Sequence, residues 1–245
     1  MYEKAKFLSS GDSGLILEVG NRISKEVNRK IRALCYCIEE MQLSEVIEII
    51  PTYTTILVLY NPLIISYEEL SKKLRDIEKS IDDVQLPPPK VVHIPTLYGD
   101  GYSTDLKYVA EHNELTMEEV INIHSSRDYL VYMLGFTPGF PYLGGMSERI
   151  STPRLENPRE KIPAGSVGIA GNQTGIYPID SPGGWQLIGR TPLKLFDPKR
   201  EPSVLLKAGE YLRFQPICKE EYEVICKEIK ENKYEIKKTA FEGDE

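Results

Sequence analysis

Residues 135–190 constrain the fold more than any other part of the chain, because glycine and proline are unusually dense there. These 56 residues hold eleven glycines and seven prolines but only nine charged side chains. Glycine and proline interrupt helices and favour tight turns. Short β-prone pieces lie between and after the turns, such as SVGIAG, WQLIG and EYLRF. Many short strands joined by turns indicate a β-barrel or a β-sandwich.

The first ninety residues have a different texture, in which strand-like and helix-like segments alternate. Apolar residues at steps of three and four predict helices over residues 27–41 and 70–81. Strand-like runs occupy residues 14–19, 45–60 and 91–94, and the second of these contains a hairpin. The order strand, helix, strand, strand, helix, strand is the ferredoxin-like split pattern. We therefore expect a ferredoxin-like α+β domain ahead of a mainly-β domain.

Three consecutive prolines, Pro87, Pro88 and Pro89, favour an extended connector and mark the expected boundary. We expect a small α+β domain over residues 1–89 and a β-barrel domain with short helices over residues 90–245. Periodicity leaves open whether the strand at residues 91–94 completes the first sheet or begins the second domain.

The composition is typical of a soluble globular protein, with 41% hydrophobic and 27% charged residues. The net charge of −7 and the scattered basic residues exclude the charge pattern of a nucleic-acid-binding protein. No apolar run approaches the ~20 residues of a membrane helix, and the first residues lack a signal-peptide core, so we expect a cytoplasmic protein. The four cysteines and three histidines have no metal-ligand spacing, and we expect no metal site.

Several polar residues are candidates for binding or catalysis. Arg154, Arg159 and Arg190 stand among prolines and glycines, where a rigidly held arginine suits bidentate capture of carboxylate or phosphate. The alternative is that these arginines hydrogen-bond backbone carbonyls and hold the loops in place. His124 ends a short predicted helix, and it either packs in the core or acts as a general acid or base.

The segment SPGGW, residues 181–185, offers a second set of candidates. Ser181, Gly183 and Gly184 form either an anion-binding nest of backbone N–H groups or a plain turn. Trp185 is either part of the barrel core or a wall on which a ligand stacks. Ser166, in AGSVG, lacks the strand, turn and helix context of a catalytic serine.

The loop GFTPGFPYLGG, residues 135–145, carries no charged side chain. We expect its aromatic residues Phe136, Phe140 and Tyr142 to anchor it in the barrel or in a partner interface. Gly139 allows the backbone to approach a ligand or partner closely. The loop is therefore predicted to shape a site, while the chemistry comes from other residues.

Three strings are too specific to be generic: YMLGFTPGFPYLGGM, PRLENPREKIPAGSVGIAGNQTGIYPIDSPGGWQLIGRTPLKLFDP and GEYLRFQPI. They closely resemble the family of the B subunit of 5-oxoprolinase. That family also includes the sporulation histidine-kinase inhibitor and proteins similar to allophanate hydrolase subunit 1, and it is related to the carboxyltransferase domain, subdomains C and D. The resemblance covers nearly the whole chain and is strongest over residues 135–216. It implies a small α+β domain joined to a cyclophilin-like β-barrel.

The resemblance also implies an activity and partners. Members of the family work with a homologous C-type subunit and with a third, A-type subunit to form an ATP-dependent 5-oxoprolinase, which cleaves 5-oxo-L-proline to L-glutamate. The implied cofactor is ATP with magnesium, and the chain is expected to be inactive without its partner subunits. Two alternatives remain: an inhibitor of a sensor histidine kinase, and a carboxyltransferase or allophanate hydrolase-type component that acts on a urea-like substrate.

The same resemblance points to site residues, with His124 as a possible proton carrier. Five residues match the family pattern and are predicted to surround the developing negative charge of the substrate carbonyl: Arg154, Arg159, Gln173, Ser181 and Arg190. Residues 98–106 depart from the pattern, because they read YGDGYSTDL where relatives commonly have Tyr-Gly-Gly-Glu-x-Gly-Pro-Asp-Leu. The usual glutamate is absent, while Asp105 and Leu106 match.

Overall fold

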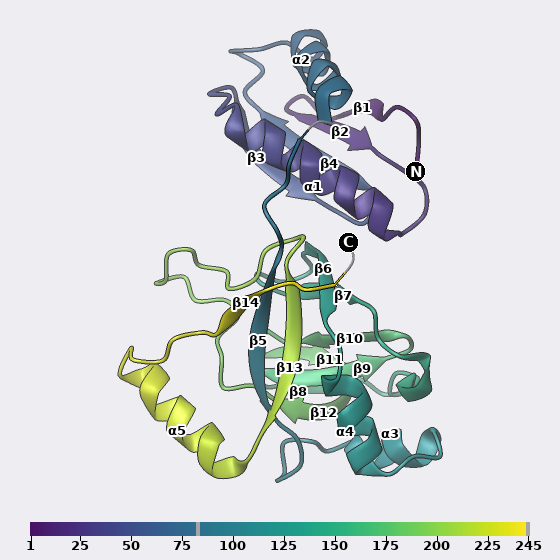
Figure 1. Cartoon of the computed structure of the whole chain (residues 1–245), viewed down its shortest axis with the longest axis vertical. Helices are drawn as coiled ribbons and strands as arrows, with labels where there is room; N and C mark the ends of the chain where they lie inside the picture. Colours follow the sequence, from purple (N-terminus) through teal and green to yellow (C-terminus); the bar gives the residue numbers. More distant parts are fainter. Residues whose placement is uncertain (82–83, 244–245) are drawn as a thin grey trace. The chain divides into compact units, whose positions relative to one another are not determined.

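The computed structural model describes residues 1–81 and 84–243. The chain forms two compact units, Met1–Pro88 and Pro89–Phe241, which are considered separately (Figure 1). The division falls one residue before the expected boundary, and Glu242 and Gly243 group with the first unit instead of the barrel unit. Within the described residues, no helix combines the length and the apolarity that crossing a membrane requires.

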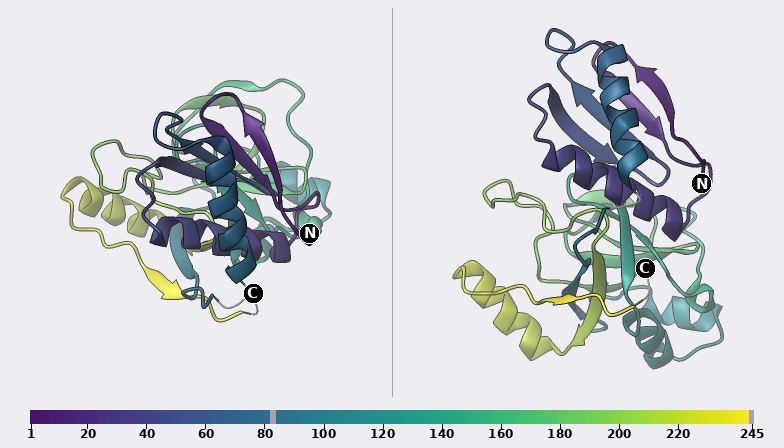
Figure 2. Two further views of the ribbon diagram at one scale, coloured as in Figure 1. Left: turned by 90° about the horizontal axis from the view of Figure 1, so that it is seen from above. Right: turned by 45° about the horizontal axis from the view of Figure 1, so that its top comes forward.

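The first unit is a four-stranded antiparallel sheet with two helices on one face (Figure 2). In chain order, its elements are β1 (Lys6–Ser10), β2 (Gly14–Glu18), α1 (Lys25–Glu40), β3 (Val46–Pro51), β4 (Thr55–Tyr60) and α2 (Tyr67–Ser80). The strand order in the sheet is β1-β2-β4-β3. Both predicted helices are confirmed, and Ile31 of α1 and Leu74 of α2 share one buried core with Leu15 and Val58 of the sheet. Packing of the two apolar helix faces against the sheet therefore stabilises this unit.

The ferredoxin-like arrangement is not confirmed in this unit. The strand expected to complete the first sheet is part of β5 (Lys90–Leu97), which belongs to the second unit. Its place beside β2 is taken by β1, which pairs with β2 as a hairpin. The sequence pattern does not reveal β1 because four of its five residues are exposed, so an apolar signal is weak. β5, in contrast, is buried at six of its eight positions.

The second unit is built mainly of short strands. In chain order, it contains β5, α3 (Leu106–His112), α4 (Met117–Ser125), β6 (Tyr129–Leu134), β7 (Pro141–Gly144), the 3-10 helix η2 (Glu148–Ile150), β8 (Arg159–Ile162), β9 (Ser166–Ala170), β10 (Gln173–Ile176), β11 (Ser181–Gly183), β12 (Gln186–Arg190), β13 (Tyr211–Ile217), α5 (Lys219–Lys230) and β14 (Lys238–Ala240).

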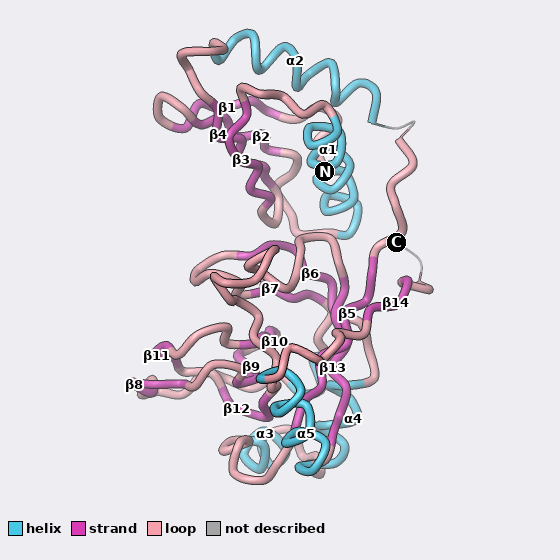
Figure 3. The backbone as a smooth tube through the Cα atoms, turned by 90° about the vertical axis from the view of Figure 1, so that its left-hand side faces the viewer, coloured by secondary structure: helices cyan, strands magenta, loops and turns pink. Residues whose placement is uncertain are grey.

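These strands form a nearly closed barrel. The sheet runs β10-β9-β12-β5-β13-β6-β7, with β14 on the edge of β5, and the end strands β7 and β10 lie against each other. β8 and β11 form a separate antiparallel pair. The helices α3, α4 and α5 lie toward one end of the barrel (Figure 3). Ile94, Ile169, Ile188 and Phe214 are buried in the barrel interior, which is consistent with the expected cyclophilin-like barrel.

Candidate functional site

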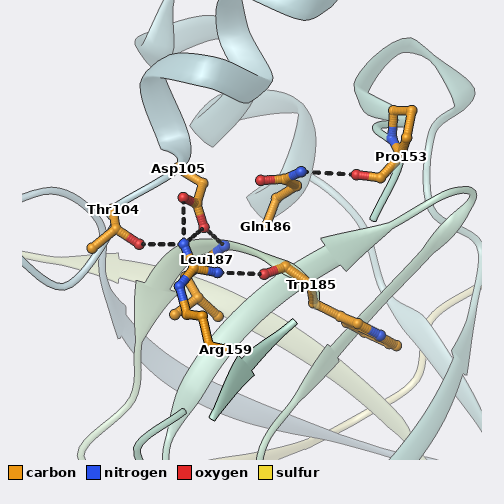
Figure 4. A network of polar contacts seen from close by, with 7 residues as sticks. All are labelled: Thr104, Asp105, Pro153, Arg159, Trp185, Gln186 and Leu187. Atoms are coloured by element: carbon orange, nitrogen blue, oxygen red, sulfur yellow. Dashed lines mark hydrogen bonds and ion pairs between the residues drawn. The ribbon is translucent and has the colours of Figure 1, made fainter. Parts of the chain in front are cut away.

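Arg159, at the start of β8, is held by an ion pair with Asp105, the residue that precedes α3 (Figure 4). Its Nη2 lies 2.7 and 2.9 Å from the two carboxylate oxygens of Asp105. Its Nη1 donates to the carbonyl of Trp185 at 3.1 Å. The two side chains are 29% and 12% exposed, so the pair is largely shielded from water. The charge of Arg159 is therefore compensated within the chain itself.

Asp105 also joins the start of α3 to β12. Its Oδ2 accepts the backbone N–H of Leu187 at 2.6 Å, and its own N–H donates to the Leu187 carbonyl at 3.0 Å. A carboxylate that accepts from both a guanidinium and a backbone N–H forms strong, geometrically fixed bonds. This geometry fits the loop-holding alternative for Arg159, which makes it a positioning residue.

Gln186 holds the neighbouring loop in a similar way. Its Nε2 donates to the Pro153 carbonyl at 2.8 Å, which ties the start of the Arg154 segment to β12 (Figure 4). Two residues further on, the N–H of Leu155 donates to the Gly184 carbonyl at 2.7 Å. The loop that carries Arg154 is thus fixed on both sides by backbone contacts.

Arg154 itself is exposed, and across residues 1–81 and 84–243 it has no ion-pair partner. Its charge acts on Tyr177: burial raises the pKa of the Tyr177 hydroxyl, and Arg154 and Arg159 oppose that rise. The backbone of Trp185 opposes the rise in the Tyr177 pKa as well. Of the two arginines predicted to be catalytic, Arg154 is therefore the one whose guanidinium is available to an anion.

Tyr177, on which the charge of Arg154 acts, belongs to an aromatic cluster. Phe140 contacts Trp185 edge-on with ring centroids 5.8 Å apart, and both rings contact Tyr177 at 6.1 Å. The ring of Trp185 packs directly over Gly175, where an added Cβ would lie 3.0 Å from it. Trp185 is half-buried, so it contributes both to the packing and to the exposed surface. We name the cluster of Arg154, Phe140, Tyr177 and Trp185 the arginine–aromatic corner.

The glycine-rich loop joins the corner through Phe140, which is buried. Tyr142 is half-buried and contacts Phe140 at 5.4 Å. Phe136 is not buried in the barrel: it is 75% exposed at a position with φ 61°, although its ring contacts Phe140 edge-on with centroids 5.8 Å apart. Gly139 has a φ of 79°, and an added Cβ would lie 3.1 Å from Phe196, so its close approach is to the barrel's own chain.

The remaining candidates from the turns lie in strands. Gln173 is the first residue of β10 and is paired with Ala170 of β9. Ser181 begins β11, opposite Ile162 of β8, and Gly183 ends it. Ser181, Gly183 and Gly184 thus form part of a strand and its end, where Gly184 receives the N–H of Leu155. Arg190 ends β12, where its Nε donates to the Ala164 carbonyl at 3.2 Å.

His124, in α4, is completely buried, and both of its ring nitrogens are hydrogen-bonded. Thr174 donates to the Gly168 carbonyl at 3.0 Å, so its Oγ1 accepts the Nε2–H of His124 at 2.8 Å. The other nitrogen, Nδ1, then accepts the Tyr98 hydroxyl at 2.7 Å. Burial lowers the pKa of His124 to about 3, so the ring is neutral near pH 7. An enclosed, neutral imidazole with both nitrogens engaged fits the core role and does not support the predicted role as proton carrier.

Three residues that organise this region are not among the candidates from the sequence: Asp105, Tyr177 and Gln186. Asp105 matches the family pattern, and an isolated Asp-Leu pair ahead of a helix is a common N-cap signal. Here the Asp105 side chain makes no capping bond, because it faces Arg159. Tyr177 and Gln186 carry no local signal, since their partners come from distant segments.

With this geometry in view, comparison with known proteins places the chain in a family. The carboxyltransferase domain, subdomains C and D, matches residues 5–206. The chain belongs to this family. Within it, the B subunit of 5-oxoprolinase from Bacillus subtilis (strain 168) is 44% identical over 222 residues, which cover 86% of this chain and 92% of that protein. The resemblance seen in the sequence is thereby confirmed.

Two further relatives of this carboxyltransferase-domain protein are longer. The crystal structure of TTHA0988 in space group P212121 has a TM-score of 0.74 and 36% identity, and the match covers 84% of this chain and 40% of that one. The urea amidolyase of Lachancea kluyveri is 33% identical over 144 residues, which cover 54% of this chain and 8% of the amidolyase. The same domain thus occurs both as a separate chain and within larger proteins.

Proposed function

We propose that this chain is the B-type subunit of an ATP-dependent 5-oxoprolinase, which works with a C-type and an A-type partner. The observation that carries the proposal is the 44% identity to a protein named as the B subunit of 5-oxoprolinase, over 92% of its length. The reaction would convert 5-oxo-L-proline, ATP and two water molecules to L-glutamate, ADP and phosphate.

The chemistry makes clear what such a site must provide. The lactam carbonyl of 5-oxoproline is unreactive, and transfer of the γ-phosphoryl group of ATP to its oxygen would activate it. Water would then attack the carbonyl carbon and the ring C–N bond would break, which leaves an acyl phosphate. A second water molecule would hydrolyse this acyl phosphate to L-glutamate and phosphate. Negative charge develops on oxygen at each stage, so cationic groups and N–H donors are needed around it.

The arginine–aromatic corner supplies a group for the substrate. Arg154 is exposed, without an ion-pair partner in the described ranges, and held on a loop that Gln186 and Gly184 fix in place. A fixed guanidinium suits bidentate capture of the 5-oxoproline carboxylate. Arg159 would position Trp185 and β12 beside it. Magnesium-ATP would enter the assembled complex as the phosphoryl donor.

The test is to co-express the chain with its two partner subunits and to purify the intact complex. We expect ADP release that depends on 5-oxoproline, with one glutamate formed per ADP. An intact complex that releases no ADP in response to 5-oxoproline contradicts the proposal.

The carboxyltransferase alternative has one observation in its favour, the match to the urea amidolyase of Lachancea kluyveri. It predicts biotin-dependent carboxyl transfer to a urea-like substrate by the same preparation. The histidine-kinase alternative predicts that the chain alone binds a sensor kinase and abolishes its autophosphorylation. Each alternative therefore has a readout that the 5-oxoprolinase proposal does not share.

A further inference from the structure

A groove of about 350 Å³ lies on the surface of the second unit, and none of its lining residues belongs to the arginine–aromatic corner. One wall is α5, which follows β13 directly (Figure 1). The other wall is Tyr102, in the loop that departs from the family pattern. The groove is lined by Tyr102, Lys219, Tyr222, Glu223, Cys226, Lys227 and Lys230.

The groove is positively charged within an acidic chain. Three lysines and a single glutamate line it, whereas the whole chain has a net charge of −7. Within residues 1–81 and 84–243, none of these three lysines forms an ion pair. Lys233, just beyond the helix, is by contrast paired with Glu231 at 2.7 Å. Unpaired lysines around a concave surface raise the local concentration of anions.

Each wall of the groove also carries a tyrosine, Tyr222 on α5 and Tyr102 on the facing loop. The rings of Tyr102 and Tyr222 stack with centroids 5.4 Å apart and an interplanar angle of 29°. The guanidinium of Arg190 lies 5.4 Å from the centroid of the Tyr102 ring, which adds a further positive charge next to that ring. Burial raises the pKa of Tyr222 to about 12, so its hydroxyl is uncharged near pH 7 and does not repel an anion.

The spacing of the lysines favours an elongated anion. Lys227 and Lys230 are one helical turn apart, and Lys219 lies about 12 Å along the axis from Lys227. A small carboxylate would meet only one of these ammonium groups, while a chain of phosphates would reach several. Lysine ammonium groups bind phosphate as compact point charges and need no bidentate geometry.

We propose that this groove binds a nucleoside triphosphate, with the triphosphate on Lys219, Lys227 and Lys230 and the base against the stacked rings of Tyr102 and Tyr222. The inference rests on the proposed function, because that reaction consumes ATP, and it assigns the nucleotide to this chain. The volume lies at the lower end of the range of ligand sites, about 300–1,000 Å³.

The test is calorimetric titration of the full-length chain with magnesium-ATP. The charge-reversal variant Lys227→Glu/Lys230→Glu should bind at least about tenfold more weakly, because two attractive charges become repulsive. The matched control is Lys199→Glu/Lys207→Glu, which changes the net charge equally at exposed lysines outside the groove. The control should bind within about threefold of the unmodified chain. Equal weakening in the two variants, or no binding by the unmodified chain, overturns the proposal.

A second ligand, inorganic triphosphate, separates the contribution of the base to the binding affinity from that of the phosphates. Inorganic triphosphate with magnesium should bind about tenfold more weakly than magnesium-ATP, because it has no base to pack against the rings of Tyr102 and Tyr222. Tyr102→Ala should reduce this difference by weakening ATP alone. Equal affinity for the two ligands in the unmodified chain contradicts a nucleotide site.

Failure of the nucleotide-site proposal can be distinguished from failure of the proposed function. If the complex turns over 5-oxoproline while the chain alone binds no ATP, the groove assignment is wrong and the function stands. If the chain binds ATP through the lysines while the complex ignores 5-oxoproline, the site stands and the function is wrong.

Discussion

Replacement of Asp105 by asparagine should destabilise the barrel unit by about 2 kcal/mol. Breaking a fully buried ion pair costs about 3–5 kcal/mol, and an exposed pair contributes about 1 kcal/mol or less. The Asp105–Arg159 pair lies between these limits, since its side chains are 12% and 29% exposed. Asparagine keeps an oxygen that can accept the Leu187 N–H, so the loss is mainly that of the charged pair. Asp105→Ala removes that acceptor too and should cost about 1–3 kcal/mol more.

The assay is urea unfolding of the full chain, followed through the only tryptophan, Trp185, which lies in the barrel unit. The midpoint should fall with an unchanged slope, and the melting temperature of this unit should drop by roughly 4–8 °C. Glu111→Gln is the control, because its pair with Lys107 is 3.6 Å long and 65% and 78% exposed. It should change the stability by less than about 0.5 kcal/mol.

A double-mutant cycle with Arg159→Gln isolates the pair. We expect a coupling energy of about 1–2 kcal/mol between positions 105 and 159. A coupling near zero, or an Asp105→Asn effect no larger than that of Glu111→Gln, would refute the reasoning that this pair holds α3 to β8 and β12.

Three further predictions concern the core, a turn and the candidate site. For His124, the unfolded chain takes up a proton near pH 6.5 that the folded chain takes up only near about pH 3, so stability falls as the pH drops through this window. This group contributes about 1.4 kcal/mol per pH unit to the slope of the unfolding free energy against pH, and in urea unfolding His124→Gln should show a slope shallower by that amount. Identical slopes for the two proteins contradict this prediction. Gly165→Ala should lower the free energy of unfolding by about 2 kcal/mol or more, because φ is 82° and the added Cβ would clash with the Thr191 carbonyl. Gly171→Ala, at φ 56° with open space around it, should lower it by about 1 kcal/mol, and thermal melting measures both changes. Arg154→Gln should lower kcat/KM for 5-oxoproline in the complex by about a hundredfold at unchanged melting temperature, whereas Arg159→Gln should lower both quantities; a loss of stability in Arg154→Gln argues against a free arginine.

The local elements of this protein were largely predictable from its sequence. The apolar stripes that predict helices over residues 27–41 and 70–81 correspond to α1 and α2, because burial of one helix face imposes a period that can be seen without the fold. The density of glycine and proline likewise indicated a domain of short strands, since these residues control the backbone directly. The resemblance to the family was likewise visible in the sequence, in the glycine- and proline-rich strings of residues 135–216.

Pairing between distant segments was decided only by the tertiary structure. The strand at residues 90–97 reads the same whichever sheet it joins, and its partner β13 lies more than a hundred residues further on. The exposed strand β1 occupies the position beside β2 that was expected for the strand at residues 90–97. Hydrogen bonding to β2 needs only a free edge on that strand, and it does not depend on an apolar pattern in β1.

The roles of the candidate residues depended on the same kind of pairing. Arg154 and Arg159 look alike in the sequence, yet Asp105, 54 positions away, engages one guanidinium and leaves the other exposed. The sequence allowed two interpretations of His124. The fold decides between them, because Thr174, from a strand 50 positions later, hydrogen-bonds its second ring nitrogen inside the barrel. An ionisable group takes its charge and its availability from its neighbours in space, so composition and local pattern identified these residues while only the fold assigned what each can do.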